Sequence, residues 1–193
     1  MVKRICVYCG SNPGNRPAYK LAAVRLAETI VERGYELVYG GANVGIMGVI
    51  ADAALAKGGK VHGVIPGALI EKEIAHQGLT RLYSVGSMAE RKQKMADLSD
   101  GFVSLPGGAG TMDEMFEMWV WAQLGWNDKP SALMNVEGYY DHLLRFLDHQ
   151  AKEGYVKQAH RDMLVVSDDA SDILDQFENY VAPNIGKWVE KSD

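Results

Sequence analysis

Residues 99–124, SDGFVSLPGGAGTMDEMFEMWVWAQL, contain a short apolar run, a glycine-rich loop and a long apolar segment in direct succession. The run Gly101 to Leu105 has the composition of a short buried strand, and the proline that follows cannot extend its hydrogen-bond ladder. Gly107, Gly108 and Gly110 then permit backbone angles and close approaches that a Cβ would prevent. The stretch therefore predicts a strand, a loop and a helix, which is the repeating unit of parallel sheets.

The start of the predicted helix is a candidate anion site. Thr111 and Glu114 have the T-x-x-E spacing of a capping box, which predicts a helix that starts at Thr111. The unpaired N–H groups and partial positive charge of its N-terminus would point at the glycine loop, an arrangement suited to a phosphate. The loop lacks the Gly-Lys-Ser/Thr of a Walker A motif and the G-x-G-x-x-G register of a dinucleotide fingerprint. Its form is P-G-G-x-G-T-x-x-E.

Strand-like and helix-like segments alternate through the rest of the chain. Further strands are expected at 5–9, 37–39, 61–65, 82–85, 132–135 and 163–166. Further helices are expected at 17–33, in the alanine-rich segment ending at 57, and at 87–98, 139–152 and 173–180. This alternation predicts a Rossmann-like, three-layer α/β fold, with a parallel sheet of about seven strands and helices on both faces. Such sheets bind ligands beyond the carboxyl ends of the strands, at a topological switch point.

Length and composition fit one soluble α/β domain. The 193 residues are enough to bury a substantial core, so we expect a single domain over 1–193 with a polar tail after about residue 183. A net charge of -5 argues against a nucleic-acid partner and against an anionic membrane surface. Because the sequence shows no signal peptide and no long apolar run, we expect a cytoplasmic protein.

The metal-ligating residue types do not form a recognisable site. Cys6 and Cys9 make a C-x-x-C, but in a strand a separation of three residues places them on opposite faces of the sheet. Redox-active pairs open a helix and structural zinc needs four ligands, so neither function is expected. The scattered histidines without metal spacing are His62, His76, His142, His149 and His160. No lysine stands in a pyridoxal phosphate setting, and we expect neither a metal nor a cofactor.

Three glycine-containing loops should meet at one edge of the sheet. They span 9–14, 40–45 and 106–111, and each follows a predicted strand and precedes a predicted helix. Any one of them could be an ordinary turn in a short β-α connection. Together they favour a nucleotide-like ligand. The further contacts expected from these loops are Ser11 and the backbones of Gly41 and Gly45.

The helix expected at 87–98 carries an arginine in an apolar row. Ser87 and Glu90 form a second capping box, which fixes the register of its first turn. The stripe expected to face the core is Met88, Arg91, Met95 and Leu98. A buried guanidinium needs an anionic partner, since an unpaired buried charge costs several kcal/mol. Arg91 could instead reach solvent, or pair with an ordinary core carboxylate.

Two motifs taken together resemble one known family. Ser87-Met-Ala-Glu-Arg-Lys92 and the P-G-G-x-G-T-x-x-E loop over 106–114 are similar to the signature of the LOG ("lonely guy") family of cytokinin riboside 5′-monophosphate phosphoribohydrolases. Members have often been labelled lysine decarboxylases, a label that nothing in this sequence supports chemically. The resemblance covers roughly residues 4–168. It implies hydrolysis of the N-glycosidic bond of a nucleoside 5′-monophosphate, such as AMP or an N6-modified AMP, to ribose 5-phosphate and a free base.

The resemblance also implies roles for individual residues. Arg91 and Glu114 match the family's catalytic arginine and glutamate, although the capping box alone explains Glu114. Lys92 and Glu73 match substrate contacts, whereas their sequence context alone would predict solvated residues. The remaining substrate contacts expected are Met88, Gly107, Gly108, Gly110 and Thr111, the last four around the 5′-phosphate.

Two other functions stay open on the sequence alone. The first is a non-catalytic carrier or sensor on the same fold, such as a molybdenum-cofactor carrier, which could use the glycine loops but would not need Arg91 and Glu114 together. The second is a general purine nucleotide nucleosidase with little preference for N6-prenylated adenine. The sequence argues well against the first function and poorly against the second.

The central helix suggests self-association. Its apolar residues are Met112, Met115, Phe116, Met118, Trp119, Val120, Trp121, Ala122 and Leu124, which occupy nearly every face. One side of a sheet cannot cover so much apolar surface, so we expect a homodimer, with Trp119 and Trp121 on the outward face. The family resemblance implies the same. Alternatively, the sheet, neighbouring helices and C-terminal segment enclose this helix entirely.

Overall fold

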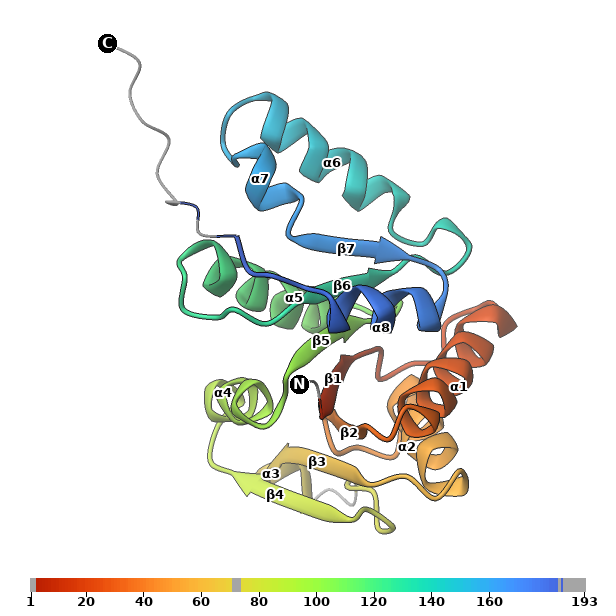
Figure 1. Cartoon of the computed structure of the whole chain (residues 1–193). Helices are drawn as coiled ribbons and strands as arrows, with labels where there is room; N and C mark the ends of the chain where they lie inside the picture. Colours follow the sequence, from red (N-terminus) through yellow and green to blue (C-terminus); the bar gives the residue numbers. More distant parts are fainter. Residues whose placement is uncertain (1–2, 71–73, 184, 186–193) are drawn as a thin grey trace.

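A seven-stranded sheet with every neighbouring pair parallel forms the centre of the computed structural model, which describes residues 3–70, 74–183 and 185 (Figure 1). The strands are β1 (Arg4–Tyr8), β2 (Glu36–Tyr39), β3 (Val61–Pro66), β4 (Arg81–Val85), β5 (Gly101–Ser104), β6 (Ser131–Met134) and β7 (Leu164–Ser167). Their order across the sheet is β4-β3-β2-β1-β5-β6-β7. The expected α/β fold with about seven parallel strands is confirmed.

Helices cover both faces of this sheet (Figure 1). They are α1 (Pro17–Glu32), α2 (Gly45–Ala56), α3 (Gly67–Ile70), α4 (Met88–Leu98), α5 (Ala109–Gln123), α6 (Asp141–Lys152), α7 (Gln158–Arg161) and α8 (Ala170–Glu178), with a 3-10 turn η1 (Val136–Gly138). Each longer helix lies within a few residues of its expected position. The short α3, η1 and α7 were not expected, because segments of three or four residues carry no hydrophobic period.

The core divides between the two faces. Side chains of α1, α2 and α8 pack on one face of the central strands, while those of α4 and α5 pack on the other. Cys6 lies in the second cluster and Cys9 in the first, and both are buried free thiols. The expectation that they occupy opposite faces is confirmed.

The chain reverses its direction of travel across the sheet between β4 and β5. From β1 it builds outward through β2 and β3 to β4, and then returns to place β5 on the other side of β1. The connection after β1 therefore leads to α1 on one face, while the connection after β5 leads to α5 on the other. Neighbouring loops that diverge in this way leave a crevice beyond the carboxyl ends of the strands.

Helix α5 is covered within the chain more fully than its sequence suggests. Trp119 is 3% exposed and its indole Nε1 donates to the backbone oxygen of His160 at 2.8 Å. The expectation that Trp119 faces outward is therefore wrong, because Trp119 belongs to a buried cluster with side chains of α6 and β7, and its indole is hydrogen-bonded to the backbone of α7. Trp121 is half-buried and Val120 is 37% exposed. Among the described residues, no helix combines the length and apolar character needed to cross a membrane.

Candidate active site

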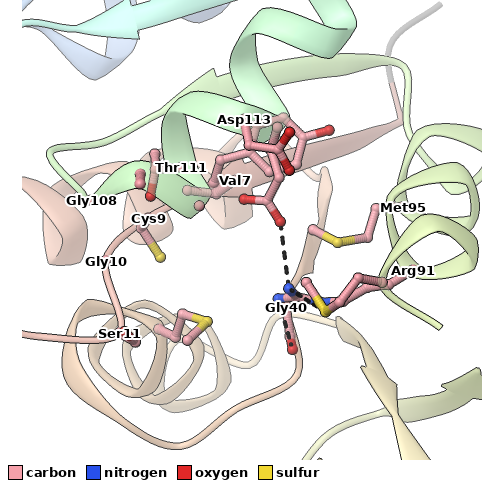
Figure 2. Close-up of a pocket in the computed structure, with 16 residues that line it drawn as sticks. Val7, Cys9, Gly10, Ser11, Gly40, Arg91, Met95, Gly108, Thr111 and Asp113 are labelled. Atoms are coloured by element: carbon pink, nitrogen blue, oxygen red, sulfur yellow. Dashed lines mark hydrogen bonds and ion pairs between the residues drawn. The ribbon is translucent and has the colours of Figure 1, made fainter.

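A cavity of about 250 Å³ lies beyond the carboxyl ends of β1, β2 and β5, at the switch point (Figure 2). The three loops predicted to meet there all contribute, through Ser11, Gly40 and Gly108. The cavity is lined by Val7, Tyr8, Cys9, Gly10, Ser11, Gly40, Met47, Met88, Arg91, Met95, Gly108, Ala109, Gly110, Thr111, Asp113 and Glu114. Backbone groups of glycine loops therefore form one wall, and side chains of α4 and α5 form another.

The first turn of α5 forms the floor beside the glycine loop. The helix begins at Ala109, with Gly108 as its N-cap in an extended conformation (φ -90°, ψ -159°), and no side chain caps it. The predicted capping box is therefore wrong: Thr111 lies inside the first turn, so its hydroxyl does not accept from Glu114. The residues of this first turn still line the cavity, and the first N–H groups of a helix have no intrahelical acceptors, so the arrangement suits an anion.

Packing explains why Thr111 does not cap the helix. Its side chain lies over Gly107, where an added Cβ would come within 2.1 Å of the Thr111 Oγ1. Thr111 is consequently 3% exposed. Two tyrosines also hydrogen-bond to the backbone of this segment, since Tyr139 donates to the Gly107 oxygen and Tyr140 to the Leu105 oxygen, each at 2.6 Å. The conformation of the glycine loop is thus fixed by the packing of Thr111 and by these two hydrogen bonds.

The loop after β1 is locked to the start of α2. Gly45 has a φ of +56°, and a Cβ there would lie 2.3 Å from the Ser11 carbonyl carbon. The Ile46 N–H donates to the Gly10 oxygen at 3.0 Å. Gly45 therefore lets two backbones approach and places Ser11 at the cavity, while itself lying outside the lining.

Arg91 extends from α4 across the cavity toward α5 (Figure 2). Its Nε donates to the Val64 oxygen at 3.0 Å and its Nη2 to the Gly40 oxygen at 3.3 Å. Its Nη1 lies 3.6 Å from the Glu114 Oε1, and only 12% of the arginine side chain is exposed. The anionic partner that the apolar row required is therefore Glu114. Ser87 caps this helix as predicted, with its Oγ accepting from the Glu90 N–H at 3.1 Å.

Glu114 is a buried carboxylate that takes no part in capping α5. Its side chain is 10% exposed, and burial raises its pKa to about 7, even though the Arg91 guanidinium acts in the opposite direction. Asp113 and Glu117 add to the upward shift. A carboxyl group with a pKa near neutrality can exchange a proton at physiological pH, which is what a general acid or base requires.

Lys92 makes a different set of contacts from its neighbour. Its Nζ lies 3.0 Å from the Asp113 Oδ2 and 2.9 Å from the Glu117 Oε2, and its side chain is 17% exposed. It joins α4 to α5 on the outer side of the Arg91 and Glu114 pair and lies outside the cavity lining. The solvated lysine that its sequence context alone would predict is therefore not found.

The structure brings together most of the predicted site residues. The cavity lining includes Ser11, Met88, Arg91, Gly108, Gly110, Thr111 and Glu114, whereas Gly41, Gly45, Lys92 and Gly107 lie outside it. Glu73 lies outside the described residues. Met88 is 50% exposed rather than facing the core, because the first turn of α4 lies over the cavity.

Sequence reasoning missed several lining residues. Cys9 and Gly40 lie in two of the loops expected at the cavity, although neither is among the individual contacts expected from the sequence. Tyr8 is the last residue of β1, so the rule that ligands bind beyond parallel strand ends could have found it. Met47 carried no such signal, because its place in the lining depends on how α2 packs against the neighbouring loops.

Comparison with known proteins agrees with this geometry. A family model described as possible lysine decarboxylase matches residues 47–177. The probable cytokinin riboside 5′-monophosphate phosphoribohydrolase LOGL5 of Oryza sativa subsp. japonica is 46% identical over 181 residues, which cover 94% of this chain and 74% of the relative. This chain belongs to the LOG family. Another LOG relative, the cytokinin riboside 5′-monophosphate phosphoribohydrolase LOG1 of Arabidopsis thaliana, is 45% identical, with 93% of this chain and 84% of the relative covered.

The LOG chain also shares its fold with solved structures of low sequence identity. The molybdenum cofactor carrier protein of Chlamydomonas reinhardtii matches with a TM-score of 0.70 and 21% identity, covering 93% of this chain and 98% of that one. The molybdenum cofactor binding protein of Rippkaea orientalis matches with a TM-score of 0.69 and 16% identity, covering 93% and 97%. At such identities the likeness shows a common Rossmann-like fold.

Proposed function

We propose that this LOG-family protein is a hydrolase that cleaves the N-glycosidic bond of nucleoside 5′-monophosphates, including N6-modified adenosine 5′-monophosphates, to a free base and ribose 5-phosphate. The observation that carries the proposal is the buried Glu114 facing Arg91 across a cavity whose floor is a helix N-terminus. The relatives are named as enzymes of the same reaction on cytokinin riboside 5′-monophosphates, which supports the proposal.

The part of the cavity that would bind the 5′-phosphate orients the substrate. The free N–H groups at the start of α5 and the Ser11 loop would hold the 5′-phosphate, which leaves the sugar and base to extend toward α4. Binding energy from a group remote from the reacting bond fixes the sugar for reaction. It would also discriminate against nucleosides without a phosphate.

At the bond that breaks, Glu114 and Arg91 would supply charge stabilisation and proton transfer. Loss of the base generates positive charge at the sugar C1′, and the ionised Glu114 would stabilise this charge. As water attacks C1′, its oxygen forms the new bond and its proton passes to the Glu114 carboxylate, while the C1′–N bond breaks with its electron pair on the base. Arg91 would orient the departing base and support the negative charge that develops on it. A proton returned to the base completes the reaction.

Direct measurement of products tests the proposal. Purified protein is incubated with AMP, isopentenyladenosine 5′-monophosphate and adenosine, and free base and ribose 5-phosphate are quantified by chromatography. We expect equal amounts of both products from the monophosphates and little from adenosine. Absence of base release from every nucleotide would overturn the assignment and favour a carrier. Equal rates for AMP and the prenylated nucleotide would indicate a general purine nucleotide nucleosidase.

The homodimer expected from the sequence is also part of the proposed function. Val120 is 37% exposed on α5, close to the half-buried Phe116 and Trp121, so an apolar part of this helix is still open to a second copy. We propose a homodimer, which light scattering would report as about twice the 21.2 kDa chain mass. An active monomer at micromolar concentration would contradict it. Val120→Glu tests the proposed interface at an exposed position and should weaken the dimer, whereas a substitution of the buried Trp119 would also disturb the core.

A further inference from the structure

Two backbone oxygens hold the Arg91 guanidinium against the ends of adjacent strands. The Val64 oxygen belongs to β3, and the Gly40 oxygen belongs to the residue directly after β2. Both oxygens accept from nitrogens of the same planar group, which fixes its position and its plane. Figure 2 shows the guanidinium between Gly40 and the carboxylate on α5, with dashed lines marking both contacts.

Gly40 has no backbone reason to be glycine. Its φ does not lie in the left-handed region, unlike that of Gly41, which is +76°. Space is the constraint, because a Cβ on Gly40 would lie 1.9 Å from the Arg91 Nη2 and 3.1 Å from its Cζ. The same Cβ would lie 3.0 Å from the Met47 Sδ, on a second side chain that lines the cavity.

Gly40 and Gly41 are adjacent, but the absence of a side chain makes room for different neighbours at the two positions. A Cβ on Gly41 would press on the Val64 nitrogen and the Ile65 Cβ, each at 3.2 Å, so that glycine allows the loop to pack on β3. A Cβ on Gly40 would meet only the far ends of flexible side chains at close range. An alanine at position 40 should consequently leave the fold intact and move the guanidinium.

We propose that Gly40 is a positioning residue for Arg91: its missing side chain gives the guanidinium the place from which it faces Glu114 across the cavity. The proposal rests on the catalytic pair of the proposed function. Its physical basis is that the neighbours of the guanidinium restrict the directions in which it can move. The Val64 oxygen restrains Nε, the Met88 Sδ lies 4.0 Å from Nη1, and Met47 occupies the adjacent space. A methyl group at position 40 would force Nη2 off the Gly40 oxygen and shift the group relative to Glu114.

A double-mutant cycle tests this role. Gly40→Ala should lower kcat by about tenfold to a hundredfold, the size expected for a catalytic group displaced by about 1 Å. The double variant with Arg91→Ala should be no slower than Arg91→Ala alone, because Gly40 acts through the arginine. Gly67→Ala is the matched control, since its Cβ would meet only the Ser84 Oγ at 3.6 Å. Multiplicative losses in the double variant would overturn the proposal.

A second readout does not depend on activity. The Nε–H resonance of Arg91, assigned as the signal lost in Arg91→Lys, should shift and exchange faster with solvent in Gly40→Ala while remaining unchanged in Gly67→Ala. An unchanged resonance in Gly40→Ala would refute the positioning role even in an inactive protein. A shifted resonance in a protein that cleaves no nucleotide would refute the proposed function and leave the placement of Arg91 supported.

Discussion

Two ion-pair groups on α4 and α5 differ in the exposure of their carboxylates and in the length of their contacts. In the inner pair, Arg91 and Glu114 are 3.6 Å apart, both side chains are almost fully buried, and both line the cavity. In the outer group, Lys92 contacts Asp113 and Glu117 at 3.0 and 2.9 Å, while the Asp113 side chain is 61% exposed. The outer group makes short contacts and the inner pair does not.

The difference indicates what each group does. The outer group joins two helices with satisfied charges near solvent, where an ion pair contributes little to stability but can fix geometry. The inner pair leaves the carboxylate of Glu114 desolvated and incompletely paired, and the raised pKa of that carboxyl group reports the resulting cost. Groups held in this state at a cavity are suited to act on a ligand.

The largest effect is expected from removing the inner cation. Arg91→Ala should lower kcat for AMP hydrolysis by roughly two to three orders of magnitude, because a preorganised charge at the departing base is lost. Steady-state kinetics of base release measures this. Near wild-type turnover in Arg91→Ala would show that the inner pair is structural.

The next effect concerns stability and pH. The pKa of Glu114 is raised from about 4.5 to about 7 in the folded protein. Between these pH values the unfolded chain loses the proton more readily than the folded protein does, so the free energy of unfolding decreases as the pH rises through this range. Above pH 7 the full cost is present, up to ~3 kcal/mol. Glu114→Gln cannot ionise and should be more stable than wild type at pH 8, with the difference vanishing near pH 4.5.

Denaturant unfolding at the two pH values measures this difference. Asp113→Asn is the control, since its exposed carboxylate should not show the same pH-dependent gain. A Glu114→Gln variant less stable than wild type at pH 8 would mean that the Arg91 contact outweighs the burial of Glu114.

A smaller effect is expected from the outer group. Lys92→Met leaves Asp113 and Glu117 without their cation and loosens the contact between α4 and α5, so kcat should fall about tenfold with KM little changed. Lys92→Arg should restore most of the activity. The family resemblance instead makes Lys92 a substrate contact, and a rise in KM with kcat preserved would favour that role.

The smallest effect is expected from ligand binding at the glycine loop. AMP should raise the melting temperature by a few degrees more than adenosine at equal concentration, because the phosphate adds binding to the folded state. Gly108→Val should remove the difference, since a Cβ at Gly108 meets no atom of the chain within 4 Å and would extend into open space. Equal shifts from AMP and adenosine in wild type would place the phosphate elsewhere.

The sequence predicted the fold well because the fold depends on local patterns. Apolar runs and helical spacing located the strands and the longer helices to within a few residues. The parallel-sheet rule then brought three separate loops to one edge, and the cavity lies there. These inferences need only periodicity and topology.

Inference from sequence failed where a side chain had two local options. Thr111 and Glu114 fit a capping box, yet Thr111 packs over Gly107 and the helix starts at Ala109. Which option is adopted depends on packing between the loop and the helix, which no spacing encodes. Trp119 likewise fits an outward-facing position by sequence, but side chains of α6 and β7 and the His160 backbone oxygen of α7 bury it.

The partners of charged residues were the hardest to predict. Arg91 and Glu114 come from different helices, and the sequence indicated only that an arginine in an apolar row needs some anion. Lys92 shows the same limit, because its two carboxylate partners lie on α5. Distances between helices follow from the packing of the whole sheet.

The most direct test of the account compares adjacent residues that each lose one negative charge. Base release from AMP is measured for Glu114→Gln and Asp113→Asn at pH 8, with folding verified by thermal melting. We expect Glu114→Gln to lose at least a hundredfold in kcat, whereas Asp113→Asn should stay within about threefold of wild type because Lys92 keeps its contact with Glu117. Equal losses in the two variants, or full activity in Glu114→Gln, would contradict the assignment of catalysis to the inner pair.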